Sequence, residues 1–314
     1  MSLIPLQWIE QAADRIAPYI KHTPLTYDPE LNVYIKWENH QVTGSFKVRG
    51  ALNKVLGLQQ WERDAGLVTA SAGNHGQGVA LAASLFDIPV IAFASNHAVP
   101  DKIRAMQQLG AEVKQVAGGY AEAEAAGILY AQQSGFTWIS PYNDGQIIAG
   151  QGTIALELLQ DLAQNSTLNW VVPAGGGGLV CGIGAVLGSR QPRPLLTAVQ
   201  SEASPFLHEI FHRGSQDGVV ELESLADGLA GPVEAGSVTI PMVKHYVDRF
   251  VLVSENDIGH AIAYAWHHYH ERIEGSAAVT LAAILTSKIV ERPAVLVVTG
   301  GNIQEQVHTQ LISH

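Results

Sequence analysis

Short apolar segments alternate with helical periods through most of the chain, and this alternation constrains the fold more than any other feature. Runs rich in valine, isoleucine and alanine predict buried strands, and apolar residues three and four apart predict the helices between them. The predicted strands cover residues 33–37, 67–69, 89–93, 112–116, 136–139, 170–172, 196–199, 250–253 and 294–298. Repeated strand, helix, strand units predict an α/β protein whose parallel sheets are covered by helices on both faces.

A second series of strand and helix units begins after Pro141 and differs in detail from the first. We therefore expect two lobes with a cleft between them. The large domain is predicted to comprise residues 1–65 and 144–314, and residues 66–143 to form a small mobile domain. The polar stretch 212–236 is expected to be a long loop or lid. Helices are predicted over residues 5–20, 51–60, 77–85, 101–109, 120–134, 151–162, 179–187, 257–269 and 277–287.

Composition restricts the possible partners and compartment. With 314 residues, 47% of them hydrophobic, the chain can bury a large core, and its single cysteine, Cys181, fits a reducing compartment. The formal net charge of -11 disfavours nucleic acid as a partner. No apolar run reaches the length of a membrane span, and residues 1–5 do not resemble a secretory signal. We expect a cytoplasmic protein that acts on a small molecule.

Lys47 lies in the stretch 43–51, beside Phe46 and among small and polar residues. A lysine that is desolvated in such a place loses its proton near neutral pH and becomes a nucleophile toward carbonyl groups. A solvated surface lysine is the simpler alternative. The choice between them depends on other motifs in the chain.

Two glycine-containing loops each follow a predicted strand and precede a predicted helix. In the first, four consecutive glycines at 175–178 leave backbone N–H groups free to bind a phosphate at a helix N-terminus. The second, 71–75, offers another anion-binding turn with serine and asparagine side chains. A flexible turn and a plain helix cap are the alternatives. Thr299 ends the last predicted strand, at the edge of a parallel sheet where ligands bind.

Together these motifs resemble the fold type II family of pyridoxal-phosphate enzymes, whose fold is of the tryptophan synthase β-like kind. Within it, the chain is most similar to the threonine/serine dehydratase and serine racemase branch. The resemblance covers nearly the whole chain. It rests on Glu38 and on residues 43–51, 71–77, 149–153, 175–179 and 299–302, with support from 99–102, 109–113 and 226–230.

The resemblance implies pyridoxal 5′-phosphate as the cofactor, bound in the large domain. Lys47 is expected to bind the cofactor aldehyde as an imine and later to act as the general base. The cofactor-binding residues implied by the family are Phe46, Lys47, Asn74, Gly175, Gly176, Gly177, Gly178, Leu179 and Thr299. Those implied for the substrate carboxylate are Ser71, Ala72, Gly73 and His75.

The implied reaction is β-elimination of water from L-threonine or L-serine, which gives a 2-oxo acid and ammonia. The family also implies a homodimer or homotetramer. Racemising relatives carry a serine where this chain has Ala72, and a methyl group cannot exchange a proton, so dehydration is favoured over racemisation. Serine racemase and 3-hydroxyaspartate or phenylserine dehydratase stay open as alternatives.

Other patterns favour different functions. The stretch 208–212, with His208, Glu209 and His212, matches the zinc-peptidase pattern, but a chain with 13 histidines can produce it by chance. The resemblance to the racemase branch implies a metal site at acidic residues that follow a glutamate matching Glu202, but here residues 203–208 contain none, so no metal site is predicted. A non-catalytic protein that binds an organic phosphate is a further alternative, and the turn at Glu274 could either face the substrate or cap a helix.

Overall fold

The computed structural model describes residues 4–162 and 168–313. Its larger sheet contains both the first and the last of the described strands. Six strands pair in the order β1, β2, β10, β7, β8, β9. Apart from β1, which is antiparallel to β2, all of these strands are parallel to their neighbours. The strands are β1 (Leu25–Asp28), β2 (Val33–Trp37), β7 (Asn169–Pro173), β8 (Leu196–Ser201), β9 (Arg249–Val253) and β10 (Ala294–Val298).

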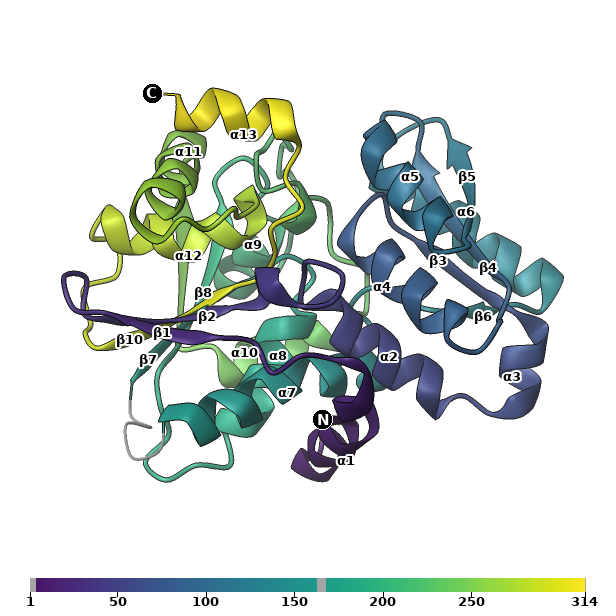
Figure 1. Cartoon of the computed structure of the whole chain (residues 1–314), viewed down its shortest axis with the longest axis horizontal. Helices are drawn as coiled ribbons and strands as arrows, with labels where there is room; N and C mark the ends of the chain where they lie inside the picture. The colour runs from purple at the N-terminus through teal and green to yellow at the C-terminus, as the bar shows by residue number, and fades with distance from the viewer. Residues whose placement is uncertain (1–3, 163–167, 314) are drawn as a thin grey trace.

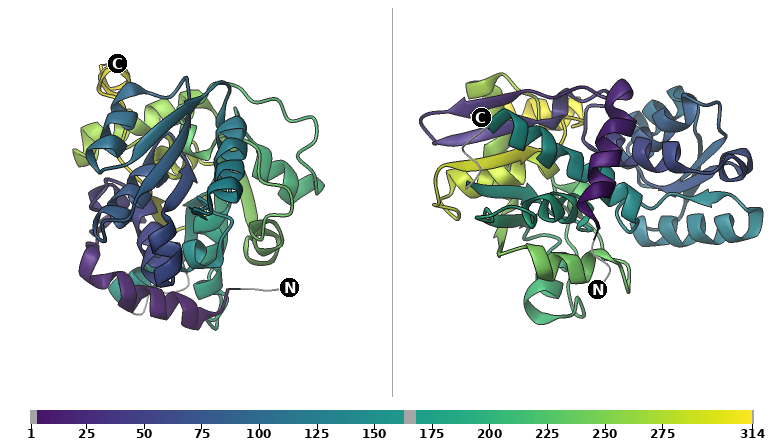
Figure 2. Two further views of the ribbon diagram at one scale, coloured as in Figure 1. Left: turned by 90° about the vertical axis from the view of Figure 1, so that its right-hand side faces the viewer. Right: turned by 90° about the horizontal axis from the view of Figure 1, so that it is seen from below.

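A second, four-stranded sheet forms a separate lobe beside the first (Figure 1). Its order is β5, β4, β3, β6, and every pair in it is parallel. The view from below in Figure 2 also shows the two lobes lying side by side. The strands are β3 (Leu67–Ala70), β4 (Val90–Ser95), β5 (Glu112–Val116) and β6 (Thr137–Trp138).

Helices cover both faces of the sheets, as the strand and helix alternation predicts. The described α-helices are α1 (Leu6–Ile16), α2 (Lys47–Gly57), α3 (Gln60–Ala65), α4 (Asn74–Ser84), α5 (Pro100–Gln108), α6 (Tyr120–Ser134), α7 (Gly145–Leu162), α8 (Gly178–Leu187), α9 (Phe206–Arg213), α10 (Thr239–Tyr246), α11 (Glu255–Tyr264), α12 (Gly275–Leu285) and α13 (Glu305–Ile312). Short 3-10 turns lie at η1 (Ala17–Tyr19), η2 (Glu38–His40) and η3 (Asp227–Leu229), and a π-helical turn at η4 (Ala265–Tyr269).

The central strand β10 shows why the larger sheet needs helices on both sides. Val295 and Val297 pack into the core on one face, whereas Leu296 and Val298 pack into the core on the other. All five of its residues are buried. Because successive side chains of a strand point to opposite faces, a strand that is apolar throughout must be covered twice. The predicted α/β fold class is confirmed.

Several elements differ from the prediction. Lys47 is the first residue of α2 and not part of a turn before it. Helix α7 begins at Gly145, six residues before its predicted start at 151, and the predicted loop 212–236 opens with the end of α9 and contains η3. Strand β1 and helices α3, α9, α10 and α13 were not predicted. The predicted domain boundaries near residues 65 and 144 remain a prediction.

Membrane spans and secretory signals were not expected. Within residues 4–162 and 168–313, every helix is too short or too polar to cross a bilayer. Residues 1–3, on which the expectation about a secretory signal partly depends, lie outside the described part of the chain.

Candidate active site

A cavity of about 980 Å³ lies between the two lobes, and both contribute to its walls. The carboxyl ends of β3, β7 and β10 and the N-terminal ends of α2, α4 and α8 meet there, which is where ligands bind in parallel α/β folds. The cavity brings together all the site residues expected from the sequence: Phe46, Lys47, Ser71, Ala72, Gly73, Asn74, His75, Gly175, Gly176, Gly177, Gly178, Leu179 and Thr299.

The Lys47 amine is held in an environment that favours its neutral form. Its Nζ donates a hydrogen bond to the Pro141 carbonyl oxygen at 3.1 Å and lies 5.5 Å from the centre of the Phe46 ring. Burial lowers the pKa of Lys47 to about 8, although the nearby Glu274 carboxylate acts in the opposite direction. A substantial fraction of this amine is therefore unprotonated and nucleophilic near neutral pH.

The glycine loop between β7 and α8 is shaped so that side chains cannot occupy it. A Cβ atom on Gly176 would lie 2.4 Å from the Tyr142 ring, and Gly177 has a φ of +90°, which favours glycine. The Thr239 hydroxyl donates to the Gly176 carbonyl oxygen at 2.7 Å and fixes the loop from outside. The first N–H groups of a helix have no partner within the helix, so those at the start of α8 can bind an anion.

The loop between β3 and α4 forms the second anion-binding turn. The Gly73 N–H donates to the Ser71 hydroxyl oxygen at 3.1 Å. The His75 side chain, only 3% exposed, has its Nε2 3.2 Å from the Ile139 carbonyl oxygen, and burial lowers the pKa of His75 to about 3. The imidazole is thus neutral at physiological pH, and a carboxylate bound here meets the helix N-terminus and not a histidinium.

Asn74 is held in one orientation by two residues that sequence analysis did not connect with it. Its Nδ2 donates to Glu274 Oε1 at 2.6 Å, and its Oδ1 accepts from Asn302 Nδ2 at 2.7 Å. Glu274 is at the N-cap position of α12, where its side chain makes no capping hydrogen bond, and it is part of the cavity wall. That it faces the substrate remains a prediction. Burial, followed by the nearby Asp227, raises the pKa of Glu274 to about 7.

Thr299 follows the last residue of β10 and is 2% exposed. Its carbonyl oxygen accepts a hydrogen bond from the Phe46 N–H at 3.0 Å, and Ser45 forms a bridge with Gly300. These bonds tie the end of β10 to the segment that carries Lys47. The two parts of the predicted site are therefore fixed to one another by the backbone.

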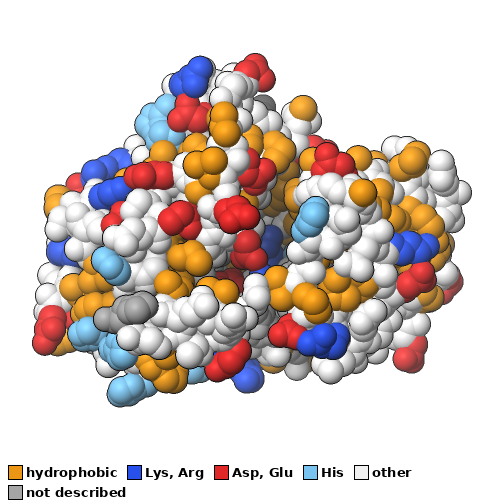
Figure 3. Space-filling view, turned by 90° about the horizontal axis from the view of Figure 1, so that it is seen from above, with side chains coloured by type: hydrophobic (Ala, Val, Ile, Leu, Met, Phe, Trp, Pro, Cys, Tyr) orange, Lys and Arg blue, Asp and Glu red, His pale blue; other side chains and the backbone are white. Residues whose placement is uncertain are grey.

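Carboxylates surround the mouth of the cavity. Figure 3 shows acidic side chains gathered along the groove between the lobes. Glu122, Glu221, Glu223, Asp227 and Glu274 all line the cavity, and Lys102 of α5 contacts the Asp227 carboxylate across the two lobes. Among the described lining residues, the amines are those of Lys47 and Lys102.

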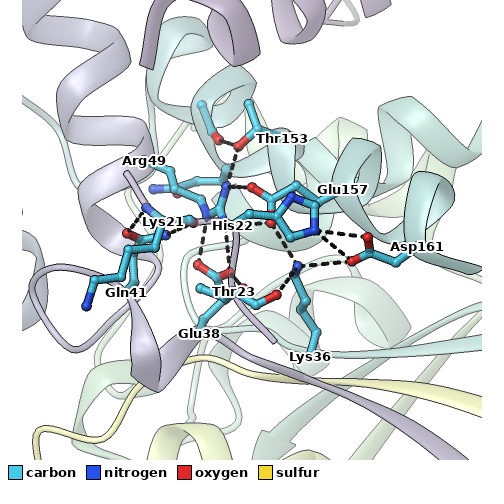
Figure 4. A network of polar contacts seen from close by, with 12 residues as sticks. Lys21, His22, Thr23, Lys36, Glu38, Gln41, Arg49, Thr153, Glu157 and Asp161 are labelled. Atoms are coloured by element: carbon cyan, nitrogen blue, oxygen red, sulfur yellow. Dashed lines mark hydrogen bonds and ion pairs between the residues drawn. The ribbon is translucent and has the colours of Figure 1, made fainter. Parts of the chain in front are cut away.

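A buried polar network lies behind the Lys47 helix (Figure 4). The Arg49 guanidinium donates two hydrogen bonds of 2.7 Å to Glu38 and one of 2.6 Å to Glu157 Oε1. The Lys36 ammonium lies 2.8 Å from Glu157 Oε2 and donates to the Thr23 carbonyl oxygen at 2.7 Å. Arg49 and Lys36 are fully buried, so this network fixes α2 two residues beyond Lys47.

The histidine patterns lie elsewhere. His208 and His212 are neighbours on α9, with ring centroids 4.4 Å apart, and Glu209 pairs with His208 and Arg213. In the part of the chain that the structure describes, no group of three or more histidine, cysteine, aspartate or glutamate side chains is arranged to hold a metal ion. A zinc-peptidase site therefore has no third ligand among these residues.

The cavity fits a phosphate-bearing aldehyde. It offers an amine with a lowered pKa and a glycine loop that a Cβ atom would fill. Pyridoxal phosphate has an aldehyde and a phosphate on one ring. The chemistry of these donors thus matches the cofactor implied by the sequence.

Known proteins of similar sequence and structure have related activities. An L-threonine ammonia-lyase from Thermotoga maritima is 37% identical over 318 residues, covering 99% of this chain and 79% of that protein. Maize serine racemase has a TM-score of 0.89 at 27% identity, with 99% of this chain and 98% of that one covered. The processed form of threonine deaminase isoform 2 from Solanum lycopersicum also has a TM-score of 0.89 at 27% identity, with coverages of 99% and 95%.

A family match gives the broader assignment. Residues 15–300 match the family described as pyridoxal-phosphate dependent enzyme, which is most of the chain. The match spans the Lys47 segment, both glycine-containing loops and the end of β10 at Thr299. Together with the cavity geometry, these comparisons show that the chain belongs to the pyridoxal-phosphate dependent enzyme family.

Proposed function

We propose that this protein is an ammonia-lyase that removes water from L-threonine and L-serine and releases a 2-oxo acid and ammonia. The observation that carries the proposal is the desolvated Lys47 amine, which shares one cavity with two anion-binding helix N-termini. The similarity to proteins named L-threonine ammonia-lyase and threonine deaminase supports the substrate.

Each residue has a proposed part in binding. Lys47 would bond covalently to the cofactor aldehyde, and the N–H groups of residues 175–179 would bind its phosphate. The second N–H of the Asn74 amide, beyond the one that Glu274 accepts, would bind the ring hydroxyl. The Thr299 hydroxyl would bind the ring nitrogen, and Phe46 would pack against the ring.

The chemistry needs a base and a held carboxylate. When bound, pyridoxal phosphate withdraws electrons from the substrate Cα and so makes its proton acidic. The turn at 71–75 holds the substrate carboxylate through backbone N–H groups and the Ser71 hydroxyl. With the cofactor and substrate bound, Lys47 would be a neutral amine within the same cavity and would take the Cα proton. The resulting ammonium would return a proton to the departing Cβ hydroxyl, which would leave as water, and hydrolysis of the released enamine would give the 2-oxo acid and ammonia.

Two observations favour this reaction over its alternatives. Ala72 lines the cavity and has no hydroxyl, so this position cannot supply the second acid that racemisation requires. The five carboxylates that line the cavity repel a second carboxylate on the substrate, which disfavours 3-hydroxyaspartate. A phenylserine is distinguished from threonine only by assay.

A substrate panel tests the proposal. Purified protein saturated with pyridoxal phosphate is given L-threonine, L-serine, 3-hydroxyaspartate and phenylserine, and 2-oxo acid and ammonia are both quantified. We expect equal amounts of the two products from threonine and serine, and no product from Lys47→Ala. D-serine without 2-oxo acid would instead identify a racemase, and phosphate binding with no turnover of any substrate would identify a non-catalytic protein.

The remaining proposals concern location and assembly. We expect a cytoplasmic enzyme, since the buried Cys181 forms no disulfide and the proposed products belong to amino-acid breakdown. We also expect a homodimer or homotetramer, as implied by the family resemblance. Light scattering after size-exclusion chromatography measures the mass directly, and a mass near that of one 33.6 kDa chain would contradict the expectation.

A further inference from the structure

Helices α7 and α2 pack with their backbones in close contact at glycine residues. A Cβ atom on Gly150 of α7 would lie 2.6 Å from the Arg49 carbonyl oxygen and from the Gly50 Cα. In return, a Cβ atom on Gly50 would lie 2.8 Å from the Ile147 carbonyl oxygen. Real Cβ atoms do not approach this closely, so any larger residue at 150 must push the two helices apart.

The same helix touches α8 in the same manner. A Cβ atom on Gly182 of α8 would lie 2.5 Å from the Ile148 carbonyl oxygen and 2.7 Å from the Gly152 nitrogen. A Cβ atom on Gly152 would lie 2.9 Å from the Gly182 carbonyl oxygen. Helix α7 is therefore clamped between α2, whose first residue is Lys47, and α8, whose first residue belongs to the glycine loop.

Gln151, between the two glycines of α7, is connected with the cavity itself. Its side chain is 1% exposed, lines the cavity, and accepts a hydrogen bond from the Gly50 N–H through Oε1 at 3.2 Å. Its Nε2 is buried and has no hydrogen-bond partner among residues 4–162 and 168–313. Buried donors are nearly always paired, so an unpaired one on a cavity wall indicates a role toward a ligand in addition to packing.

We propose that α7 is a spacer that sets the separation between Lys47 and the phosphate-binding loop, with Gly150, Gln151 and Gly152 as its positioning residues. The inference rests on the proposed function, in which the aldehyde of one ligand reaches Lys47 and its phosphate reaches the loop. Two anchors on one rigid ligand strengthen each other only when the protein holds their partners at the matching distance. A changed separation weakens the two-anchor ligand while each single anchor still binds.

Three probes separate these effects. Pyridoxal 5′-phosphate uses both anchors, pyridoxal lacks the phosphate, and pyridoxine 5′-phosphate lacks the aldehyde. For Gly150→Ala we expect the Kd of pyridoxal 5′-phosphate to rise at least about tenfold, with the Kd values of the two single-anchor probes within about twofold of wild type. Alanine is the better helix former, so loss of helix does not account for such a pattern.

The matched control is Gly57→Ala on α2, where a Cβ atom would come no closer than 3.7 Å to Arg15. All three Kd values should stay at the wild-type level in this variant. Should Gly150→Ala fail to fold, Gln151→Met decides the question, since it removes the bond to Gly50 without adding bulk between the helices. The same selective loss of pyridoxal 5′-phosphate is expected from it.

Other outcomes overturn the inference. Equal weakening of all three probes in the variant that folds would mean general damage, and an unchanged Kd for pyridoxal 5′-phosphate would mean that α7 does not set the separation. The proposed function fails separately, when borohydride reduction of cofactor-treated wild-type protein leaves no label on Lys47. In that case the wild-type protein does not bind pyridoxal 5′-phosphate through both Lys47 and the glycine loop, and the comparison of variants no longer applies.

Discussion

At the scale of single residues, the site depends on two buried groups whose pKa values have moved toward each other. Burial lowers the pKa of Lys47 to about 8 and raises that of Glu274 to about 7. Each shift has the sign expected when a charged form is taken out of water. Both groups therefore change protonation near physiological pH, whereas an ordinary lysine titrates well above it and an ordinary glutamate well below it.

The Lys47 amine gives a prediction for cofactor loading. The nucleophilic form grows as pH rises toward the pKa of about 8, so imine formation with added pyridoxal phosphate should accelerate about tenfold per pH unit below that value and level off above it. Stopped-flow absorbance measures this rate. A plateau reached only near the ordinary lysine pKa of 10.5 would contradict burial as the cause, and Lys47→Ala should show no such phase.

Glu274 gives a prediction for the pH dependence of catalysis. Above its pKa of about 7 the ionised carboxylate accepts the Asn74 hydrogen bond and orients that amide. We expect kcat/KM of the wild type to fall as pH drops through about 7, and Glu274→Gln to lose this acidic limb because an amide does not titrate. Glu271→Gln, which affects a carboxylate bound to His40 and Asn39, is the control and should retain it.

The same carboxyl group affects stability with a defined sign. A pKa raised from 4.5 to about 7 means that the folded state binds the proton more tightly, so this contribution is present below pH 4.5 and is lost as pH rises through 7. Glu274→Gln should therefore be more stable than wild type at pH 8, by at most about 3 kcal/mol, and the gain should shrink by pH 5. Urea titrations at both pH values measure it.

The residue scale also marks the limit of sequence analysis. Residues 71–75, 175–179 and Thr299 were predictable as part of the cavity wall because each stands in a short motif after a strand, and Phe46 and Lys47 because of the family resemblance. Tyr142, Glu221 and Glu223 also line the cavity and were not predicted. The contacts of Asn74 with Glu274 and Asn302 were not predictable, since they join positions 200 and 228 residues apart. The neutral state of the His75 side chain likewise depends on burial and on the nearby Lys47, which lower its pKa and which no local pattern reveals.

At the scale of elements, α2 is held at its start by the polar network behind the cavity. Replacing Arg49 by methionine leaves the fully buried Glu38 carboxylate without its cation, whereas Glu157 keeps its pair with Lys36. Removing one partner of a buried pair is expected to cost about 3–5 kcal/mol. Urea unfolding measures the loss, and Arg213→Ala, which breaks the exposed pair with Glu209, should cost about 1 kcal/mol or less. Equal losses in the two variants would show that burial of the network is energetically unimportant.

Elements were predictable where burial governs their sequence. Most strands of the two sheets are apolar because both faces are covered, and the limits of the predicted strands agree within two residues. Strand β5 was predicted although none of its residues is buried. Strand β1 was missed because two of its four residues are exposed, and α3 because none of its residues is buried. The start of α7 was missed because Gly145 and Gly150 indicate a break in a helix, whereas in the structure Gly150 allows close contact with α2.

At the scale of the whole molecule, the cavity between the lobes couples cofactor binding to stability. A ligand that binds only the folded state stabilises it by about 2.7 kcal/mol at a concentration of 100 times its Kd. Removing pyridoxal phosphate should therefore lower Tm, and Lys47→Ala should show a smaller difference between its loaded and stripped forms. Differential scanning calorimetry measures both. An identical Tm with and without cofactor would contradict binding at this junction.

The glycine loop has one more consequence. Residues 175–179 are four glycines and a leucine, so the anchor contains no side chain that gains or loses a proton. The loop attracts an anion through fixed peptide dipoles, whose strength does not change with pH. A site built from lysine or histidine side chains would lose its positive charge at high pH. Inorganic phosphate should thus compete for this loop of the empty enzyme at every pH above its own second ionisation. Buffers made from it will slow reconstitution even where the catalytic amine is fully neutral.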